Sequence, residues 1–308
     1  MDYLHWNNNF YTKFRNIQGG FHILPILKSI VFVLLLLSSF FVTDFVFFKI
    51  VIEDSFEHKQ SLNYSDANNV DIVFVGTSHT RNAINHEFIP NSFNFAGSGK
   101  NHLLSYYQLK QIMNKDLEID TLVVEIDQVS FSNHIYTEPF LFPNPNYYTG
   151  FYTLEDAMII QEKNQVDVYL EYLFPFVGRG KEFIKTENAE KFEGFRSGYV
   201  NSIEKDFVPN ERGVEAFLEI VKLAKENNMR LILIKQPYLK EYASESNDSE
   251  FYENLFSKVN NITLEYEFFD YSNFFTSTEY FSDAYHLNDK GAKKFTKYLN
   301  QKVVLTLE

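Results

Sequence analysis

The stretch DIVFVGTSHT at residues 71–80 decides the fold, because an apolar run of strand length ends in a turn that contains glycine. Similar short apolar runs follow at residues 92–96, 121–126, 230–235 and 264–270. Helical patterns alternate with them at residues 101–114, 154–172, 211–227, 249–260 and 288–301. Strands that alternate with helices favour a parallel sheet covered on both faces. The sequence therefore predicts an α/β fold of three layers, α/β/α, with a five-stranded parallel sheet.

The serine of this turn stands where such a sheet binds its ligands, beyond the carboxyl end of a strand. Ser78 follows the first strand, and the motif DAYH near the C-terminus contains Asp283 and His286. A serine hydroxyl becomes a good nucleophile when a histidine takes its proton and an acid orients that histidine. Each motif alone is more often structural, as a strand-to-helix turn or a helix cap. Together they indicate a Ser-His-Asp catalytic set and an enzyme of acyl chemistry.

The composition of the chain excludes several classes of partner and cofactor. The chain has 308 residues, a formal net charge of -13 and no cysteine. An acidic surface repels a phosphate backbone, so we expect no nucleic-acid partner. Without cysteine the chain forms no disulfide and no thiolate metal site. His102 and His134 show no metal-ligand spacing with His286, and we expect neither a metal nor another cofactor.

An apolar segment near the N-terminus predicts a membrane anchor. The sequence IVFVLLLLSSFFVTDFVFF at residues 30–48 contains one charge, Asp44, and a run of this length can span a bilayer as a helix. Basic residues precede it and acidic residues follow it, which predicts that residues 1–27 lie in the cytoplasm and that residues from 53 onward lie outside. We expect a transmembrane signal-anchor helix over residues 28–52. The alternative is a buried core helix, in which Asp44 would avoid hydrocarbon.

The rest of the chain divides into a stalk and one main domain. Residues 53–69 are polar and read as the stalk, and residues 70–308 form the predicted catalytic domain. Residues 128–209 contain many aromatic and turn-forming residues, which indicates an insertion that is too long for a simple connection. This insertion could act as a lid or bind substrate, or it could be packing material that never contacts substrate.

The motifs occur in the order of a known enzyme class. The turn NFAGSG at residues 94–99 follows the second strand, and DAYHLNDKG at residues 283–291 closes the domain. Residues 70–305 resemble the SGNH/GDSL hydrolase superfamily, and with the anchor they look most like its membrane-anchored, extracytoplasmic branch. That branch includes the D-alanyl transfer protein of teichoic acid D-alanylation and the partners of membrane-bound O-acyltransferases.

The resemblance implies a role for several residues. Ser78 matches the nucleophile, His286 the general base and Asp283 its orienting acid. The family builds its oxyanion hole from the backbone N–H of the nucleophile, here Ser78, and a glycine N–H after the second strand, here Gly97 or Gly99.

One element departs from the family pattern. Hydrolytic members carry Gly-x-Asn-Asp after the third strand, whereas this chain has EIDQ at residues 125–128. Asn101 could supply the missing side-chain donor from the turn after the second strand. The anchored transfer branch commonly lacks Gly-x-Asn-Asp too, so the departure favours a transferase over a free esterase.

Four further residues are candidates for substrate binding. His79 and Arg81 follow the nucleophile, Asp127 follows the third strand and Gln236 follows the fourth. Each has a structural alternative, such as a helix start, a loop cap or a surface position.

The sequence thus predicts an extracytoplasmic serine acyltransferase that O-acetylates or otherwise acylates a cell-surface glycan or a teichoic acid-like polymer. An esterase or deacetylase of the same glycan would use the same residues, because both share the covalent step. The alternative from a different class is a non-catalytic accessory subunit of a membrane-bound O-acyltransferase. The intact Ser78, Asp283 and His286 set argues against that alternative.

Overall fold

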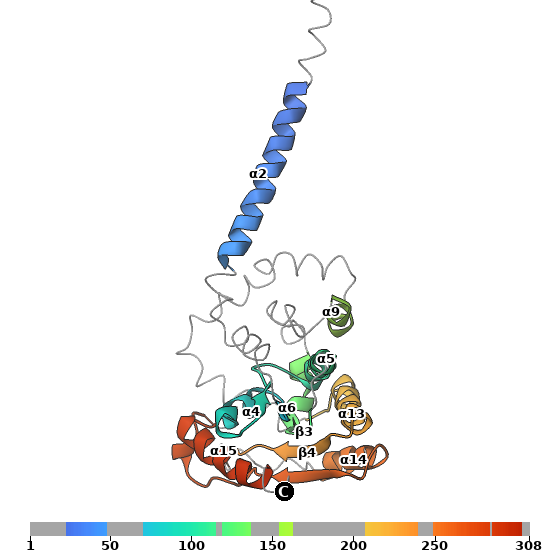
Figure 1. The fold of residues 1–308 in the computed structure, drawn as a ribbon, viewed down its shortest axis with the longest axis vertical. Coiled ribbons are helices and arrows are strands. Elements are labelled where there is room, and N and C mark those ends of the chain that lie inside the picture. Colours follow the sequence, from blue (N-terminus) through green and yellow to red (C-terminus); the bar gives the residue numbers. More distant parts are fainter. Residues whose placement is uncertain are drawn as a thin grey trace, which may run out of the picture.

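This computed structural model describes residues 23–47, 70–114, 119–136, 154–162, 207–239, 249–283 and 285–303. They form one long N-terminal helix and an α/β domain that begins at Val70 (Figure 1). The predicted stalk and most of the insertion over residues 128–209 lie outside the described residues, as does the second half of the helix expected at residues 154–172.

The N-terminal helix α2 (Ile23–Phe47) covers most of the predicted membrane segment, and residues 48–52 of the expected anchor helix lie outside the described residues. Its part from Pro25 to Thr43 is long and apolar enough to cross a membrane, and none of it is buried against the domain. The helix begins five residues before the expected start at residue 28, since Pro25 fits a first turn, where its missing N–H costs nothing. The hydroxyls of Ser29, Ser38 and Thr43 each donate to the carbonyl four residues earlier, which satisfies them within the helix.

The predicted five-stranded parallel sheet is confirmed. Its strands, in the spatial order β2-β1-β3-β4-β5, pair in parallel throughout, and their bounds are β1 (Ile72–Val75), β2 (Ser92–Asn94), β3 (Thr121–Glu125), β4 (Arg230–Lys235) and β5 (Tyr266–Asp270). The last strand starts two residues later than expected, and Leu264 before it is 79% exposed. β1 has β2 on one side and β3 on the other. The chain therefore adds β2 on one side of β1 and all later strands on the other side, so its winding direction reverses between β1 and β3. That reversal creates the crevice in which doubly wound sheets bind ligands.

Helices cover both faces of the sheet (Figure 1). One face carries α5 (His102–Met113), α13 (Glu211–Glu226) and α14 (Ser249–Asn260), and the other carries α4 (Ser78–Ala83) and α15 (Asp289–Val303). Shorter elements are α6 (Gln128–Phe131), α9 (Leu154–Gln161) and three 3-10 helices, η3 (His86–Phe88), η4 (Asn133–Tyr136) and η6 (Thr278–Tyr280). The three-layer α/β/α prediction is thereby confirmed.

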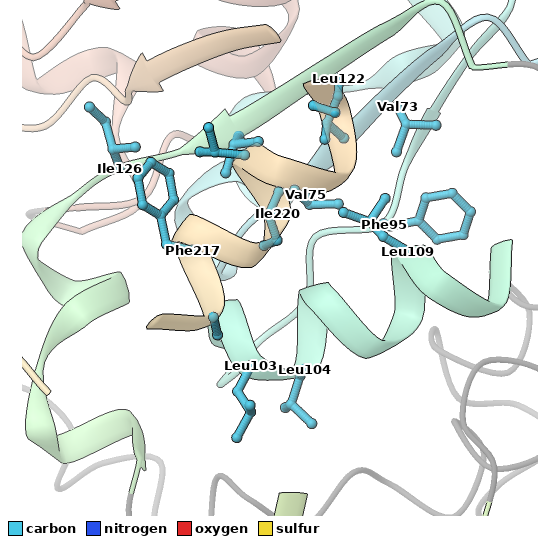
Figure 2. Packing of buried hydrophobic residues seen from close by; sticks show 14 of the residues in the cluster. Val73, Val75, Phe95, Leu103, Leu104, Leu109, Leu122, Ile126, Phe217 and Ile220 are labelled. Atoms are coloured by element: carbon cyan, nitrogen blue, oxygen red, sulfur yellow. The ribbon is translucent and has the colours of Figure 1, made fainter. Parts of the chain in front are cut away.

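The core lies on both sides of the strands, because successive side chains of a strand point to opposite faces. Figure 2 shows Val73, Val75 and Leu122 of the sheet with Phe217 and Ile220 of α13, all buried in the first cluster. The second cluster, on the opposite face, contains Ile72, Phe74, Val123, Ile232 and Ile234 of the sheet with Phe295 and Leu299 of α15. Burial of each such side chain contributes about 1.5–3 kcal/mol. This two-sided core holds the carboxyl ends of β1, β3 and β4 at one edge.

Candidate active site

The turn after β1 presents Ser78 at the first position of α4. Thr77 caps this helix, and its side-chain oxygen accepts a hydrogen bond from the backbone N–H of His79 at 3.1 Å. A threonine in extended conformation before a helix is a favoured N-cap, since its oxygen satisfies a free N–H of the first turn. Ser78 is therefore held on a short, capped turn at the carboxyl edge of the sheet.

The fold brings together the three residues of the predicted catalytic set. The Ser78 Oγ lies 2.8 Å from Nε2 of His286, although 208 positions separate them. The Nδ1 of His286 lies 2.9 Å from each carboxylate oxygen of Asp283. This arrangement assigns a proton to Nδ1, donated to Asp283, and leaves Nε2 as the acceptor for the serine hydroxyl. Such a chain can remove the serine proton during nucleophilic attack.

The carboxyl of Asp283 stays ionised throughout the neutral range. Burial alone would raise its pKa, but the hydrogen bond to His286 and the backbone N–H of Tyr285 outweigh burial and lower the pKa to about 2. The Oδ1 of Asp283 accepts from the N–H groups of Tyr285 and His286 at 2.9 and 3.0 Å. Asp283 thus acts both as a local turn cap and as the partner that orients the imidazole.

The loop that carries His286 is pinned to its neighbours. The Ser282 N–H donates to the His286 carbonyl at 2.8 Å, and Phe281 forms an antiparallel bridge with Leu287. Asn288 then caps α15, because its Oδ1 accepts from the Gly291 N–H at 3.0 Å. The helix start expected at Asn288 is confirmed. It fixes the position of His286 relative to the sheet.

Glu125 is the residue that sequence analysis missed. This last residue of β3 is fully buried and accepts four hydrogen bonds from the turn that carries Ser78. Thr77 donates its N–H at 2.9 Å and its hydroxyl at 2.7 Å, and Thr80 donates its N–H at 3.1 Å and its hydroxyl at 2.6 Å. Burial raises the pKa of Glu125, whereas these donors favour its charged form. A carboxylate at the end of the otherwise apolar strand TLVVE was the available signal, since a buried charge requires partners.

Three of the four predicted substrate-binding residues lie in the same network. The Nδ1 of His79 lies 3.0 Å from Oδ2 of Asp127, and the backbone N–H of Gln236 donates to the other oxygen of Asp127 at 3.1 Å. The Gln236 side-chain amide donates to the Thr80 hydroxyl at 2.9 Å. All of these side chains are buried, and the network joins the ends of β3 and β4 to the nucleophile turn. Their predicted contact with substrate stays a prediction.

The His79 ring lies against the loop that carries Tyr285 and His286. It stacks on Tyr285 with ring centroids 5.6 Å apart and meets the ring of His286 edge-on at 5.2 Å. Burial lowers the pKa of His79, but the hydrogen bond and charge of Asp127, with Glu125 and Asp283, outweigh burial and raise the pKa above 6.5. His79 is therefore positively charged at acidic pH and retains that charge at higher pH than a free histidine.

His79, Glu125 and Asp127 have potential ligand atoms within 4.8 Å of one another, which raises the question of a metal ion. The oxygens of Glu125 already face two N–H and two O–H donors, and both oxygens of Asp127 have partners. Donors directed at the carboxylates would have to turn away before a cation could bind. These contacts fit a hydrogen-bond network better than a metal site.

The predicted oxyanion and surface residues have other contacts. The Gly97 N–H donates to the Gly76 carbonyl at 3.2 Å and would have to leave it to bind a substrate oxygen. Asn101 caps α5 through Leu104 at 3.0 Å and donates to the Ile135 carbonyl at 2.7 Å, so its contacts serve the fold. Arg81 donates to Ser98 at 2.7 Å on the outside of the turn. The functional roles of these three residues stay predictions.

His102 is a core residue. It is 1% exposed, its Nε2 lies 3.0 Å from the Ser130 hydroxyl, and its ring packs on Phe131 and Phe217. Burial lowers its pKa to about 3, which keeps the imidazole neutral.

Comparison with known proteins identifies similar solved structures at low identity. The chain is 14% identical, with a TM-score of 0.42, to a protein of Bacteroides fragilis NCTC 9343 described as an acylhydrolase, over 83% of this chain and 100% of that one. It is 11% identical, with a TM-score of 0.41, to a Streptococcus pneumonia protein described as a platelet activating factor, over 89% and 99%. It is 11% identical, with a TM-score of 0.40, to a GDSL-like lipase of Bacteroides thetaiotaomicron VPI-5482, over 82% and 98%.

A protein-family model matches residues 201–308, which include Asp283 and His286 but less than half of the chain. No curated protein sequence matches the chain.

Proposed function

We propose that this chain is a serine acyl-transfer enzyme of the SGNH/GDSL type, with Ser78 as nucleophile, His286 as general base and Asp283 as orienting acid. The single observation that carries this proposal is the continuous contact from Ser78 Oγ to His286 Nε2 at 2.8 Å and from His286 Nδ1 to Asp283 at 2.9 Å. The position of Ser78 beyond β1, at the winding reversal of the sheet, supports it.

The reaction has two halves. In the first, the Ser78 oxygen attacks the carbonyl carbon of an ester while His286 takes the hydroxyl proton. The tetrahedral intermediate collapses, His286 returns the proton to the leaving alcohol, and an acyl group remains on Ser78. In the second, an acceptor hydroxyl attacks the acyl carbon, His286 takes its proton, and Ser78 is released with that proton. The new ester carries the acyl group.

We assign transfer to a sugar hydroxyl as the second half-reaction. The chain has EIDQ at residues 125–128 instead of the Gly-x-Asn-Asp of hydrolytic relatives, and Glu125 and Asp127 there bind the nucleophile turn. Resolution of the acyl-enzyme by water defines the competing function, an esterase or deacetylase of the same glycan. That function uses the same three residues in the same first half-reaction.

The proposed setting is the outer face of a cell membrane. The apolar helix α2 supports an anchor, and the basic residues before it support a cytoplasmic N-terminus. A domain held there would meet surface glycans or teichoic acid-like polymers, with a membrane-bound O-acyltransferase as the proposed partner. The accessory-subunit alternative is less favoured, because a binding module has no need for a complete Ser-His-Asp chain.

A fluorophosphonate probe on the full-length chain in detergent tests the nucleophile. We expect covalent labelling of the wild type and none of Ser78→Ala. Ser257→Ala, an exposed position on α14, is the matched control and should label like the wild type. Labelling that persists in Ser78→Ala would remove Ser78 as nucleophile, and a wild type that never labels would favour the accessory subunit.

A second measurement separates transfer from hydrolysis. The wild type is given 4-nitrophenyl acetate with and without a glycan acceptor, and both nitrophenolate and acetylated sugar are measured. A transferase should release nitrophenolate faster with acceptor and produce the sugar ester. A rate that is independent of the acceptor, with acetate as the product, would assign the chain to the esterases.

A further inference from the structure

A second imidazole–carboxylate pair lies beside the Asp283–His286 pair. His79 and Asp127 meet at 3.0 Å, both buried, and the His79 ring contacts the His286 ring edge-on at a centroid distance of 5.2 Å. His79 directly follows Ser78 in the chain. His79 and Asp127 therefore lie beside the catalytic histidine but take no part in the proton transfer described above.

Asp127 of the His79–Asp127 pair stands where the Gly-x-Asn-Asp motif has its asparagine. When EIDQ is set against Gly-x-Asn-Asp, Asp127 takes the place of the asparagine, whose amide would donate to a substrate oxygen. An ionised carboxylate cannot donate, and its charge would repel a developing oxyanion. In this chain, however, Oδ1 of Asp127 accepts from the Gln236 N–H and Oδ2 is bonded to His79. The imidazolium thus compensates the charge of Asp127.

The imidazolium also retains a donor. A protonated histidine carries two N–H groups, and Nδ1–H of His79 is directed at Asp127, which leaves Nε2–H. No hydrogen bond joins Nε2 to any other residue among the ranges that the structure describes. The ring that bears this N–H contacts Tyr285 and His286, and Nε2 of His286 is bonded to the Ser78 hydroxyl.

We propose that the Nε2–H of His79 is a donor of the oxyanion hole and takes the part of the missing asparagine amide. This inference rests on the proposed function and names a further catalytic residue for it. The donor contributes to the rate because it meets a full negative charge only in the tetrahedral intermediate. Asp127 is then a positioning residue, which acts through His79.

The protonation state of His79 makes the proposal sensitive to pH. A neutral His79 that keeps its Nδ1–H on Asp127 presents a bare Nε2, so the donor exists only in the charged ring. The charged and titratable groups that face the ring are Asp127 and Glu125 at the end of β3, and Asp283, Tyr285 and His286 in the C-terminal loop. The three carboxylates hold the proton on His79, and the donor is lost when the pH rises past the raised pKa.

The test variant is His79→Asn in the full-length chain, assayed with 4-nitrophenyl acetate, a neutral ester. An asparagine amide can keep the contact to Asp127 in place of Nδ1 but has no atom at the position of Nε2. We expect kcat to fall by about 10²–10³-fold with KM nearly unchanged, as for the loss of one oxyanion donor. His86→Asn is the matched control, because His86 lies on η3 and packs on Phe93. A His79→Asn variant with unchanged kcat, or with only a raised KM, would overturn the proposal.

The pH profile gives an independent readout that needs no variant. Wild-type kcat should fall at alkaline pH as His79 loses its proton. In His79→Asn the alkaline fall should disappear. A wild-type kcat with no alkaline fall over the pH range in which the enzyme stays folded would contradict the proposal even if the variant did not fold.

Fluorophosphonate labelling separates a failure of the donor role of His79 from a failure of the proposed function. If the wild type labels through Ser78 and His79→Asn labels at the same rate, the donor role of His79 fails and the proposed function stands. If the wild type does not label, the proposed function itself fails.

Discussion

The hydroxyl of Thr80 donates to the Glu125 carboxylate at 2.6 Å, although 45 positions separate the two residues. The same hydroxyl accepts from the Gln236 side chain at 2.9 Å. Thr80 therefore connects the turn that carries Ser78 to the ends of both β3 and β4. The turn that carries Ser78 is thus held in place by hydrogen bonds to buried groups.

Thr80→Val tests this connection. The valine side chain has nearly the same shape but leaves Glu125 without one donor and Gln236 without its acceptor, so we expect a loss of about 1–3 kcal/mol in the free energy of unfolding. Fluorophosphonate labelling should slow as well. Urea unfolding and labelling rates of the full-length chain measure the two effects. Thr80→Ser keeps the hydroxyl and should retain most of the stability and most of the labelling rate. Equal losses in Thr80→Val and Thr80→Ser would contradict a role for the Thr80 hydroxyl.

Gly76→Ala tests the closeness of the turn to β3. A Cβ at residue 76 would lie 2.4 Å from Oε2 of Glu125 and 2.6 Å from Oγ1 of Thr80, which displaces the network. We expect a cost of about 1–3 kcal/mol in stability and a strong loss of labelling. Gly213→Ala, on α13, is the control, because its Cβ would lie 2.5 Å from the ring of Tyr136 on η4 rather than beside Glu125 or Thr80. It should lose stability but label normally when folded, and a similar labelling loss in both would refute a specific effect at residue 76.

Asp283→Asn should lower kcat/KM by roughly 10³–10⁴-fold with little change in fold, because the amide cannot hold His286 in the required tautomer. The pKa of Asp283 is lowered from 3.8 to about 2, so its stabilising charge is fully present above pH 3.8 and is lost as the pH falls toward 2. Protonation of Asp283 should therefore begin to lower wild-type activity only as the pH falls toward 2. A loss of wild-type activity near pH 4 that is absent from Asp283→Asn would contradict this assignment. Ester hydrolysis across the pH range measures both points.

His102 should make the fold sensitive to acid. Burial lowers its pKa from 6.5 to about 3, so the folded state binds fewer protons than the unfolded state between these values. The contribution of neutral His102 to stability is fully present above pH 6.5. Below that pH the free energy of unfolding should fall by about 1.4 kcal/mol per pH unit, because the unfolded chain takes up the proton.

His102→Gln should flatten this part of the profile, measured by urea unfolding at a series of pH values. Burial lowers the pKa of His86 in the same direction, and His86→Gln serves as the comparison at a less buried site. An unchanged slope in His102→Gln would show that other groups cause the acid sensitivity.

Local patterns were sufficient to predict much of the fold. The strand expected at residues 230–235 matches β4, and the helix expected at residues 249–260 matches α14, since the apolar periodicity of each segment reflects the layer it packs in. The short helix α4 was not predicted, because its six residues, SHTRNA, carry no apolar stripe. It forms because Thr77 caps it and Glu125 accepts its free N–H and hydroxyl groups.

The sequence by itself determined the parallel sheet, the apolar N-terminal helix and the choice of Ser78, Asp283 and His286 as candidate residues, because strand periodicity, hydropathy and short motifs are local properties. Only the tertiary structure decided that Glu125 binds the nucleophile turn, that Asp127 pairs with His79, and that Asn101 caps a helix. These pairings depend on which strand ends meet at the sheet edge, and strand order is set by packing over the whole domain. A carboxylate in a sequence does not show which donors will surround it.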